Sequence, residues 1–352
     1  MKWYCLIMLL CEGLAAQVAA QDVLSPARPM ALSAALLRAP SDADSFYIQR
    51  YRRENDVRLF YGAQGSSLAY GSERKNDSEV NTALYNNVND LVGFGLSYKF
   101  IDFDLSYSLP KVRILDEDRQ NLSQFKLVFS STGRKLAIRA SYSDSKGVIV
   151  VDQGGDFSSA PDIHLSRTGI QLSYYFNCKK YSWRAANFQN ELQRRSAGSF
   201  LLRLEPFYRS IGMKSPIVPA GLDTREIYGN QVGLSYVRSP GLIIMGGYGH
   251  NFAMYGGRFF VSPIVFVGPG LACNIYKAET GTQTKLNAEW AGFFALNVGY
   301  NGAKTYATLK GVYEAGYFKL NPSYFTTSDL KIMLTIGLRF YHLEKFIPTS
   351  VF

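Results

Sequence analysis

The sequence has no long hydrophobic run beyond its first residues, and this absence excludes one class of membrane protein. A transmembrane helix requires about 20 consecutive apolar residues, and no later segment provides them. Histidine and cysteine are also scarce, with three and four residues among 352. No cluster of cysteine, histidine and aspartate has the spacing of metal ligands, so we predict no metal site and no cofactor.

The first 20 residues have the pattern of a secretory signal peptide. Lys2 gives the positive start, residues 3–10 form a short apolar run, and small residues lead up to Ala20. We therefore expect cleavage near Ala20. The apolar run is too short to cross a bilayer as an anchor.

The remaining chain divides into two parts by composition. Residues 21–55 are rich in Ala, Pro and Ser and then become charged, so we predict a periplasmic lead-in. Residues 56–352 are predicted to form one further domain. Cys178 and Cys273 are the cysteines outside the signal peptide, and the sequence leaves open whether they pair.

Strict alternation near the C-terminus is the clearest pattern that the chain does have. From Leu330 to Phe340 every second residue is apolar, and the residues between them are mostly polar, charged or small. Successive side chains of a strand point to opposite faces, so this pattern predicts a strand with two unlike faces. No helix or second sheet is predicted that could cover the apolar face. We therefore expect this face to contact lipid and the other to face a lumen.

The composition of the whole chain agrees with a membrane-spanning barrel. It has 24 Tyr and 23 Phe, a mean hydropathy of −0.07 and a formal net charge of +10. Near-neutral hydropathy is expected where only half of each strand faces lipid. The positive charge does not favour nucleic acid, because the chain is secreted and lacks a basic helix. The predicted partners are outer-membrane lipid and lipopolysaccharide, with the barrel-assembly machinery during biogenesis.

The predicted fold class is all-β, a transmembrane antiparallel up-and-down β-barrel of about 12–14 strands in a Gram-negative outer membrane. Fourteen segments have a strand pattern: 57–64, 91–100, 103–109, 125–130, 136–142, 168–177, 181–190, 199–210, 229–238, 241–251, 257–268, 288–301, 303–316 and 329–341.

The connections predict the orientation of the barrel, because short turns are normally periplasmic and long loops extracellular. The short turns are 100–102, 131–134, 178–180 and 301–303, and the long loops are 65–90, 144–167, 269–286 and 317–328. The rule fails around 211–240, where a long connection precedes a short turn at Ser239-Pro240-Gly241. Either the connection at 211–227 is periplasmic, or a strand pair is miscounted and the barrel has twelve strands.

One polar segment, YSWRAANFQNELQRRSAGSFLL at 181–202, carries a family resemblance. Together with residues 47–60 and 268–271, it resembles an uncharacterised family of outer-membrane β-barrels from Bacteroidetes-type bacteria, domain of unknown function family 4421. The resemblance extends over nearly the whole mature chain. It implies an outer-membrane barrel and assigns no activity. The motif residues are Arg184, Asn190, Glu191, Ser196, Gly198 and Ser199.

The first candidate site consists of charged residues that alternation places in the lumen. They could form a channel lining that selects anions or sugar acids, or they could pair across a closed barrel. The segment at 184–199 similarly predicts either a recognition patch or a hairpin whose polar groups satisfy one another. The predicted lumen-facing residues are Lys99, Asp102, Asp104, Lys126, Arg139, Arg184, Arg203, Glu205, Arg209, Lys310, Glu314, Lys331 and Arg339.

We expect a protein without enzymatic activity, acting as a structural barrel or a narrow, anion-preferring channel. His164, His250 and His342 lie in no recognisable arrangement of nucleophile, histidine and acid. One alternative is a barrel whose long loops bind a surface or secretion partner. A further alternative is an enzyme that modifies lipid or lipopolysaccharide. The sequence names no solute, no partner and no oligomeric state.

Overall fold

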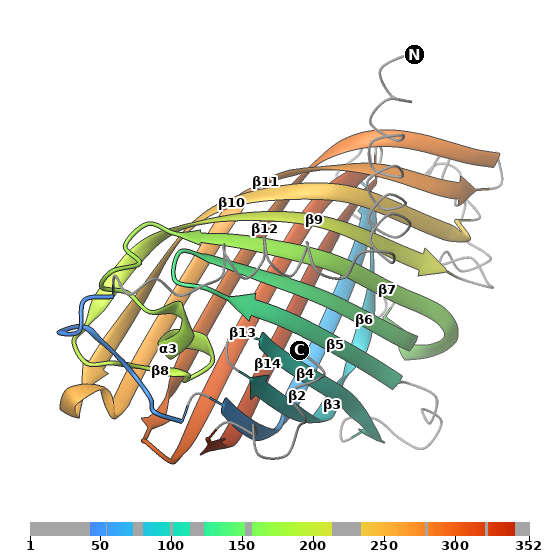
Figure 1. Ribbon diagram of the computed structural model, residues 1–352. Helices are drawn as coiled ribbons and strands as arrows, with labels where there is room; N and C mark the ends of the chain where they lie inside the picture. The colour runs from blue at the N-terminus through green and yellow to red at the C-terminus, as the bar shows by residue number, and fades with distance from the viewer. Residues whose placement is uncertain are drawn as a thin grey trace, which may run out of the picture.

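The chain forms a closed antiparallel barrel of twelve strands (Figure 1). The computed structural model describes residues 43–53, 55–72, 80–98, 101–112, 123–151, 157–212, 234–278, 281–320 and 323–341. The all-β barrel predicted from alternation is confirmed, with the lower of the two strand numbers. The signal peptide and most of the predicted lead-in lie outside the described residues.

Neighbouring strands around the barrel are hydrogen-bonded in the order β10-β11-β12-β13-β14-β2-β3-β4-β5-β6-β7-β9. Beyond the shorter β4 and β5, β3 also pairs directly with β6. The barrel strands are β2 (Asn55–Ser72), β3 (Val80–Tyr98), β4 (Ile101–Val112), β5 (Ser123–Thr132), β6 (Leu136–Val151), β7 (Phe157–Tyr175), β9 (Ala197–Gly212), β10 (Tyr236–Met254), β11 (Phe259–Ala278), β12 (Gly281–Asn301), β13 (Thr305–Leu320) and β14 (Ser323–Phe340).

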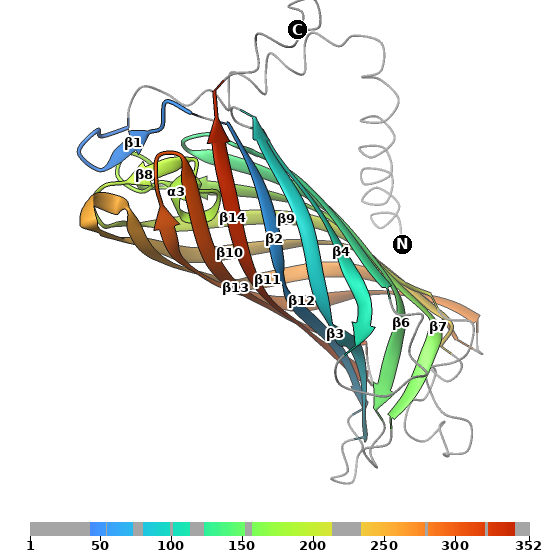
Figure 2. The ribbon, with the colours of Figure 1, turned by 90° about the horizontal axis from the view of Figure 1, so that it is seen from below.

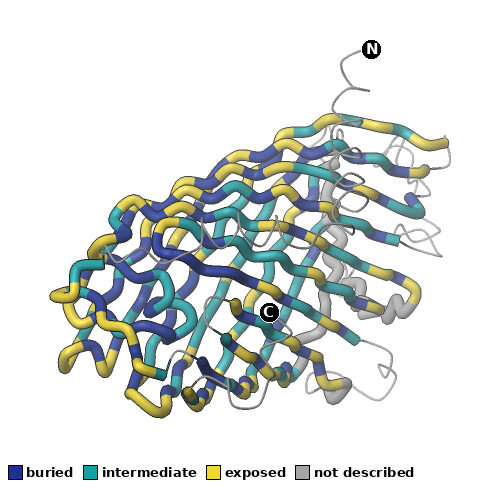
Figure 3. Tube along the Cα trace, viewed as in Figure 1, coloured by how far each residue is buried: buried dark blue, intermediate teal, exposed yellow. Residues whose placement is uncertain are grey.

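The outer face of the barrel carries the apolar residues of each alternating strand. On β14, Leu334 is 51% exposed whereas the next residue, Thr335, is 9% exposed. The same change from exposed to buried recurs along the other strands (Figure 3). An apolar outer face of this kind is stable only against lipid, so the predicted orientation of the C-terminal strand is confirmed.

The strands are longer than a bilayer requires. β12 contains 21 residues, whereas a tilted transmembrane strand needs about 9–11. On β14 the exposed apolar residues lie between Leu330 and Leu338, and the strand begins seven residues earlier, at Ser323. One end of the barrel therefore extends beyond the apolar belt; we call it the far end.

The strand count of fourteen is wrong in two places. The predicted strand at 241–251 and the end of the one predicted at 229–238 belong to the single strand β10, which begins at Tyr236; residues 229–233 lie outside the described residues. Pro240 pairs with Tyr208 of β9, while the pairing with β11 is interrupted between Arg238 and Gly241. A proline, which has no N–H group, is tolerated in a strand where ladder pairing is interrupted. Thus Pro240 does not form a turn, and the connection from β9 to β10 falls at 213–233, outside the described residues.

The second wrong strand is the one predicted at 181–190. This segment contains the short helix α3 (Trp183–Asn187), and β7 pairs directly with β9. Ser182, the residue before the helix, caps its N-terminus: its side-chain oxygen accepts a hydrogen bond from Ala185 N at 3.0 Å. A serine in this position stabilises the first turn of a helix.

The predicted long loops are mostly strand in the structure. The segments 269–286 and 317–328, for example, are interrupted only at 279–280 and 321–322, which lie outside the described residues. Beyond the membrane both faces of a strand can be polar, so alternation gives no signal there. The predicted turns at 131–134 and 301–303 are confirmed within one or two residues.

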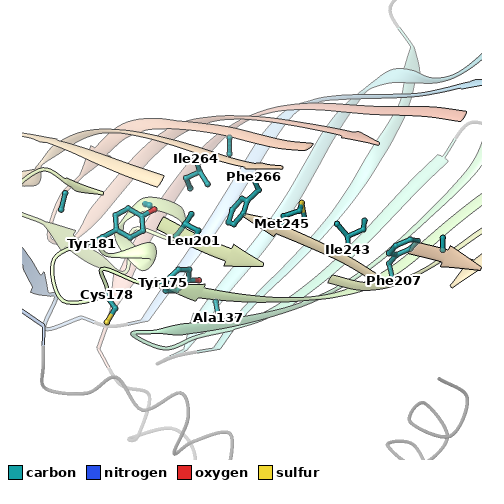
Figure 4. Packing of buried hydrophobic residues seen from close by; sticks show 14 residues of the cluster. Ala137, Tyr175, Cys178, Tyr181, Leu201, Phe207, Ile243, Met245, Ile264 and Phe266 are labelled. Atoms are coloured by element: carbon teal, nitrogen blue, oxygen red, sulfur yellow. The ribbon is translucent and has the colours of Figure 1, made fainter. Parts of the chain in front are cut away.

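A cluster of buried apolar residues lines one side of the barrel interior. It includes Tyr175 of β7, Leu201 of β9, Met245 of β10 and Phe266 of β11 (Figure 4). These neighbouring strands form an apolar quadrant of the inner wall.

No disulfide joins Cys178 to Cys273 among the described residues. No helix of the described chain has the length and hydropathy needed to cross a bilayer.

Candidate functional site: the lumen and its plug

One end of the barrel is filled by a segment of the chain that folds inward. Residues 176–196 connect β7 to β9 and contain α3 and β8 (Glu191–Gln193). The short strand β1 (Ile48–Arg50) pairs with β8, with Ile48 opposite Gln193. Figure 2 shows β1, β8 and α3 gathered at this end. We call residues 176–196 the plug and this end the plugged end.

The plug is held together by buried polar side chains. Ser182 Oγ donates to Glu191 Oε2 at 2.5 Å, which joins the start of α3 to β8. Gln193 Oε1 accepts from Ser182 N at 2.9 Å, and Gln193 Nε2 donates to Lys180 O at 2.7 Å. Buried polar groups that are satisfied in this way give the segment one defined conformation.

Two arginines of the barrel bind the plug. Arg134, in the turn after β5, donates two parallel hydrogen bonds to the Glu191 carboxylate, at 3.1 and 3.0 Å. Arg339 of β14 donates to the carbonyl oxygen of Gln189, and to Asn301 Oδ1 at 2.5 Å. The planar guanidinium is suited to binding several oxygen atoms at once. Both arginines are buried.

Amide side chains on the inner wall supply further contacts. Asn297 Nδ2 and Asn301 Nδ2 of β12 donate to the carbonyl oxygens of Ala186 and Glu191, at 2.8 and 2.9 Å. Asn251 Nδ2 of β10 donates to Ser182 O at 3.2 Å. The plug is thus bonded to backbone oxygens from several sides of the barrel.

Two aromatic residues support the arginine at position 339. Its guanidinium carbon lies 4.0 Å from the ring centre of Tyr51 and 4.8 Å from that of Tyr306. Tyr51 Oη donates to Asn301 O at 2.7 Å. Burial raises the pKa of Tyr51 to about 12, so the hydroxyl remains protonated and can donate this bond at neutral pH.

A second buried network connects the wall to the plug through Asp102. Arg58 of β2 donates to Asp104 Oδ1 at 2.9 Å and to Ser97 Oγ at 2.6 Å, and Ser97 donates to Asp102. Asn190 Nδ2 of the plug in turn donates to Asp102 Oδ1 at 3.3 Å. Asp56 Oδ1 also accepts from Arg58, at 3.1 Å, so one guanidinium serves several carboxylates and this network has an excess of negative charge.

A cavity of about 190 Å³ lies in the lumen beside the plug. Trp183, Asn187, Phe188 and Gln189 of the plug form part of its lining. Seven cationic and three acidic side chains also line it: Arg58, Lys126, Arg139, Arg167, Arg203, Lys310 and Lys331, with Asp104, Glu314 and Asp329.

Several of these cations have no acidic partner. Among the described residues, no carboxylate oxygen lies within 4.0 Å of the charged nitrogens of four of them. They are Lys126, Arg139, Lys310 and Lys331. Lys310 Nζ donates to the neutral Asn187 side chain at 3.2 Å, and Lys331 Nζ lies 5.8 Å from the ring centre of Phe60. The cavity therefore has a surplus of positive charge.

Towards the far end, the lumen charges are paired. Arg167 lies 2.9 Å from Glu205 and 3.8 Å from Glu314, and Arg209 lies 2.6 Å from Glu289. These residues line a smaller adjoining pocket of about 40 Å³. The surplus of positive charge is thus confined to the level next to the plug.

The predicted lumen residues occupy three different settings. Asp102 and Arg339 contact the plug, and Glu205 and Arg209 lie in the paired pocket. Arg184 belongs to α3 and not to a barrel strand, because the strand predicted there does not form. Lys99 lies outside the described residues. The cavity brings together Asp104, Lys126, Arg139, Arg203, Lys310, Glu314 and Lys331.

The family-motif residues lie in and beside the plug. Asn190 and Glu191 make the contacts described above, and Ser196 Oγ accepts from Ala253 N at 3.0 Å. Ser199 Oγ accepts from Asn177 N at 2.9 Å, and Gly198 O accepts from Asn177 Nδ2 at 2.8 Å. These polar groups are hydrogen-bonded to the surrounding chain.

Sequence reasoning missed several residues of the site. Arg134 was placed in a turn and Arg167 in a loop, and Trp183 was placed on a strand that does not form. Asn297 is missed as well, although its position has the opposite parity to Trp290 and Tyr300, which are exposed on the outer face of the same strand,. Inward and outward residues alternate along a strand. Continuing this alternation along each predicted strand identifies Asn297 and Arg167 as inward-facing.

Two of the three histidines lie on the barrel strands. His164 Nε2 is 2.5 Å from Asp144 Oδ1, and His250 Nδ1 is 3.2 Å from Tyr248 Oη. His342 lies outside the described residues. Within the described part of the chain, no group of three or more His, Cys, Asp or Glu residues could hold a metal ion.

Comparison with known proteins gives a family match and a shared fold. The sequence matches the family described as "Domain of unknown function (DUF4421)" over residues 42–340. No curated protein matches the chain.

Solved structures with a similar fold are outer-membrane barrels. The outer membrane protease OmpT from Escherichia coli is 8% identical with a TM-score of 0.39, over 81% of this chain and 96% of that chain. The translocator domain of the autotransporter NalP from Neisseria meningitidis is 9% identical with a TM-score of 0.34, over 95% and 99%. The toluene transporter TodX of P. putida is 9% identical with a TM-score of 0.26, over 82% and 90%.

Proposed function

The chain belongs to the family described as a domain of unknown function (DUF4421) and has the fold of an outer-membrane β-barrel, and we propose that it is a narrow, anion-preferring transport barrel. The observation that carries this proposal is the surplus of cations in the cavity. A confined region lined by one sign of charge concentrates ions of the opposite sign. Rings of Lys and Arg are the usual lining of anion-selective pores.

We assign the plug the role of closing this route. It fills one end of the lumen, and side-chain hydrogen bonds attach it to the barrel wall. Such bonds each contribute about 1 kcal/mol net and can be exchanged for bonds to water. A plug held in this way can shift without breaking the barrel ladder.

We place the plugged end in the periplasm and the far end outside the cell. Apart from the plug, the connections at the plugged end, such as 133–135, 255–258 and 302–304, are short, whereas the far end also has connections of seven residues or more, at 73–79 and 113–122 and between β9 and β10. Short connections are typical of the periplasmic side. In this orientation lipopolysaccharide surrounds the outer part of the apolar belt, after the barrel-assembly machinery has inserted the chain.

We further propose that the protein is not an enzyme. Among the described residues, His164 contacts Asp144 and His250 contacts Tyr248. Neither histidine is bonded to a serine or cysteine of the described chain, and such a bond would be the geometric sign of an activated nucleophile.

The test is the current carried by the refolded full chain in a planar bilayer under a salt gradient. Arg339→Met loosens the plug, and Asn187→Ala with Asn190→Ala is a milder second variant. We expect a small or intermittent current from the wild type, and a steady, anion-selective current from a loosened variant. Adding Lys126→Glu and Lys331→Glu should abolish the anion preference.

Folding is checked separately by heat-modifiable migration on gels and by circular dichroism. Folded variants with a loosened plug that stay silent, or that prefer cations, would overturn the proposal. A shift of the reversal potential after charge reversal, with folding unchanged, would support it.

A further inference from the structure

The cavity beside the plug has two chemically different walls. The cations Lys126 and Arg139 come from β5 and β6, and Lys310 and Lys331 come from β13 and β14. The apolar quadrant lies between these two groups, on β7 and β9 to β12. In the closed order of twelve strands, β12 is six positions from β5, so the two lie on opposite sides of the lumen.

Two aromatic residues, Trp183 and Phe293, connect the apolar quadrant to the cavity. Trp183 of the plug stacks on Tyr175 with ring centres 5.0 Å apart. Trp183 and Phe293 of β12 both contact Phe266, and both line the cavity while remaining only partly buried. Their uncovered surface is therefore available to an apolar group.

The cationic part of the lining attracts an anion. Lys126, Arg139, Lys310 and Lys331 line this one cavity, and no carboxylate oxygen of the described residues lies within 4.0 Å of their charged nitrogens. Like charges that converge in a partly enclosed space are unfavourable unless an opposite charge compensates them. Amides of Gln64, Gln124 and Asn297 lie on the same lining and can donate further hydrogen bonds to an oxyanion,.

From these two walls we infer that the cavity binds small organic acids, with a carboxylate or phosphate group on an apolar body about the size of one ring. This inference rests on the transport route proposed above. An inorganic anion would leave the aromatic wall unused. A neutral apolar molecule would leave the cations uncompensated. A compound with both parts satisfies both walls.

The size of the cavity sets the size of the apolar body. A protein cavity of roughly 150 Å³ accommodates one benzene molecule, and this cavity has about 190 Å³. One ring with its acid group therefore fits, whereas a long acyl chain does not. The guanidinium of Arg203 lies 4.7 Å from the ring centre of Phe293, so it can bind an acid group beside the aromatic surface.

Trp183 allows binding to be measured directly. The chain has three tryptophans, and the full chain with Trp3→Phe and Trp290→Phe retains only Trp183. We would titrate this refolded protein with phenyl phosphate and benzoate, and compare acetate, inorganic phosphate and benzyl alcohol. We expect saturable quenching by the two aromatic acids, with dissociation constants at least ten-fold lower than for the other three compounds.

Variants of each wall provide the controls. Lys126→Met with Lys331→Met should weaken binding of both aromatic acids at least ten-fold and leave benzyl alcohol unchanged. Phe293→Ala should weaken the aromatic acids and leave inorganic phosphate unchanged. Lys277→Met is the matched control, because Lys277 is exposed near the end of β11 and does not line the cavity.

The outcomes separate this inference from the proposed function. Equal affinity for phenyl phosphate and inorganic phosphate, or for benzoate and benzyl alcohol, would overturn the inference, and an anion-selective current would still support the transport route. Absence of quenching in folded protein would also overturn it. Selective binding of aromatic acids in a barrel that carries no current would support the inference and reject the transport route.

Discussion

Arg134 and Arg339 at the plugged end each donate at least two hydrogen bonds to oxygen atoms, whereas Lys126 and Lys331 in the neighbouring cavity have no carboxylate of the described chain within 4.0 Å. All four residues face the lumen and carry the same charge. The difference shows how one barrel interior is divided. Arg134 and Arg339, whose hydrogen bonds have acceptors in or beside the plug, fix the plug, whereas the cavity lysines without acidic partners leave positive charge available to a solute.

The largest effect is expected where this pairing is broken. Glu191→Gln leaves the buried Arg134 guanidinium without its counter-charge, at a cost of about 3–5 kcal/mol. We expect the plug to detach and the bilayer current to rise at least ten-fold. Glu289→Gln is the matched control, since Glu289 is also buried and pairs with Arg209 away from the plug. Equal currents from the two variants would contradict the role given to Glu191.

A smaller effect should follow from crowding the plugged end. In Gly337→Ala the new methyl group would overlap the ring of Tyr306, whose hydroxyl donates to Asp56 at 2.7 Å. We expect the free energy of unfolding in detergent to fall by about 1–3 kcal/mol.

The matched control for this crowding is Gly311→Ala on β13. No atom lies within 4 Å of a methyl group added there, so its stability should stay within about 0.5 kcal/mol of the wild type. If both alanine variants lose the same stability, the plugged end is not the more tightly packed region.

A third variant tests geometry at constant charge. Arg134→Lys keeps the positive charge but cannot donate two parallel hydrogen bonds to Glu191, so we expect a loss of about 1–2 kcal/mol. Denaturant unfolding in detergent measures this loss. Unchanged stability would mean that charge alone, and not the shape of the guanidinium group, holds the plug.

The smallest effect on stability is expected in the cavity. Lys126→Met with Lys331→Met removes mutually repelling charges, so the free energy of unfolding should change by less than about 1 kcal/mol. The reversal potential of a variant with a loosened plug should nevertheless shift towards zero. A large loss of stability would show that these lysines serve the fold, as the arginines do.

The sequence predicted best those parts of the fold that lipid constrains. Between Leu330 and Leu338 every outward residue must be apolar, so alternation is strict and the strand is evident,. Beyond the belt no such constraint exists, and the same strands were predicted as loops. Parity also predicted seven of the ten charged residues that line the cavity, because an inward residue such as Lys126 or Lys310 is two positions from the next inward residue.

The plug could not be predicted in this way. Its helix has five residues, which is too short to show helical periodicity. Its positioning bonds connect residues far apart in the chain, such as Arg339 to Gln189, 150 positions apart, and Asn301 to Glu191, 110 positions apart. Local pattern carries no information about such pairs. The segment was therefore predicted to be a strand.

The contact between Tyr306 and Asp56 has a consequence for the order of assembly. These residues are 250 positions apart, and they meet only when β14 has paired with β2 and closed the barrel. Arg339 of β14, which binds the carbonyl oxygen of Gln189 and lies over the ring of Tyr51, is beside this seam. Pairing of β14 with β2 thus completes part of the site that holds the plug. Contacts between residues so far apart in the sequence form slowly. The hydrogen bond from Arg339 to the plug therefore depends on closure of the barrel, whereas the bonds from Arg134 and Asn251 do not involve this seam.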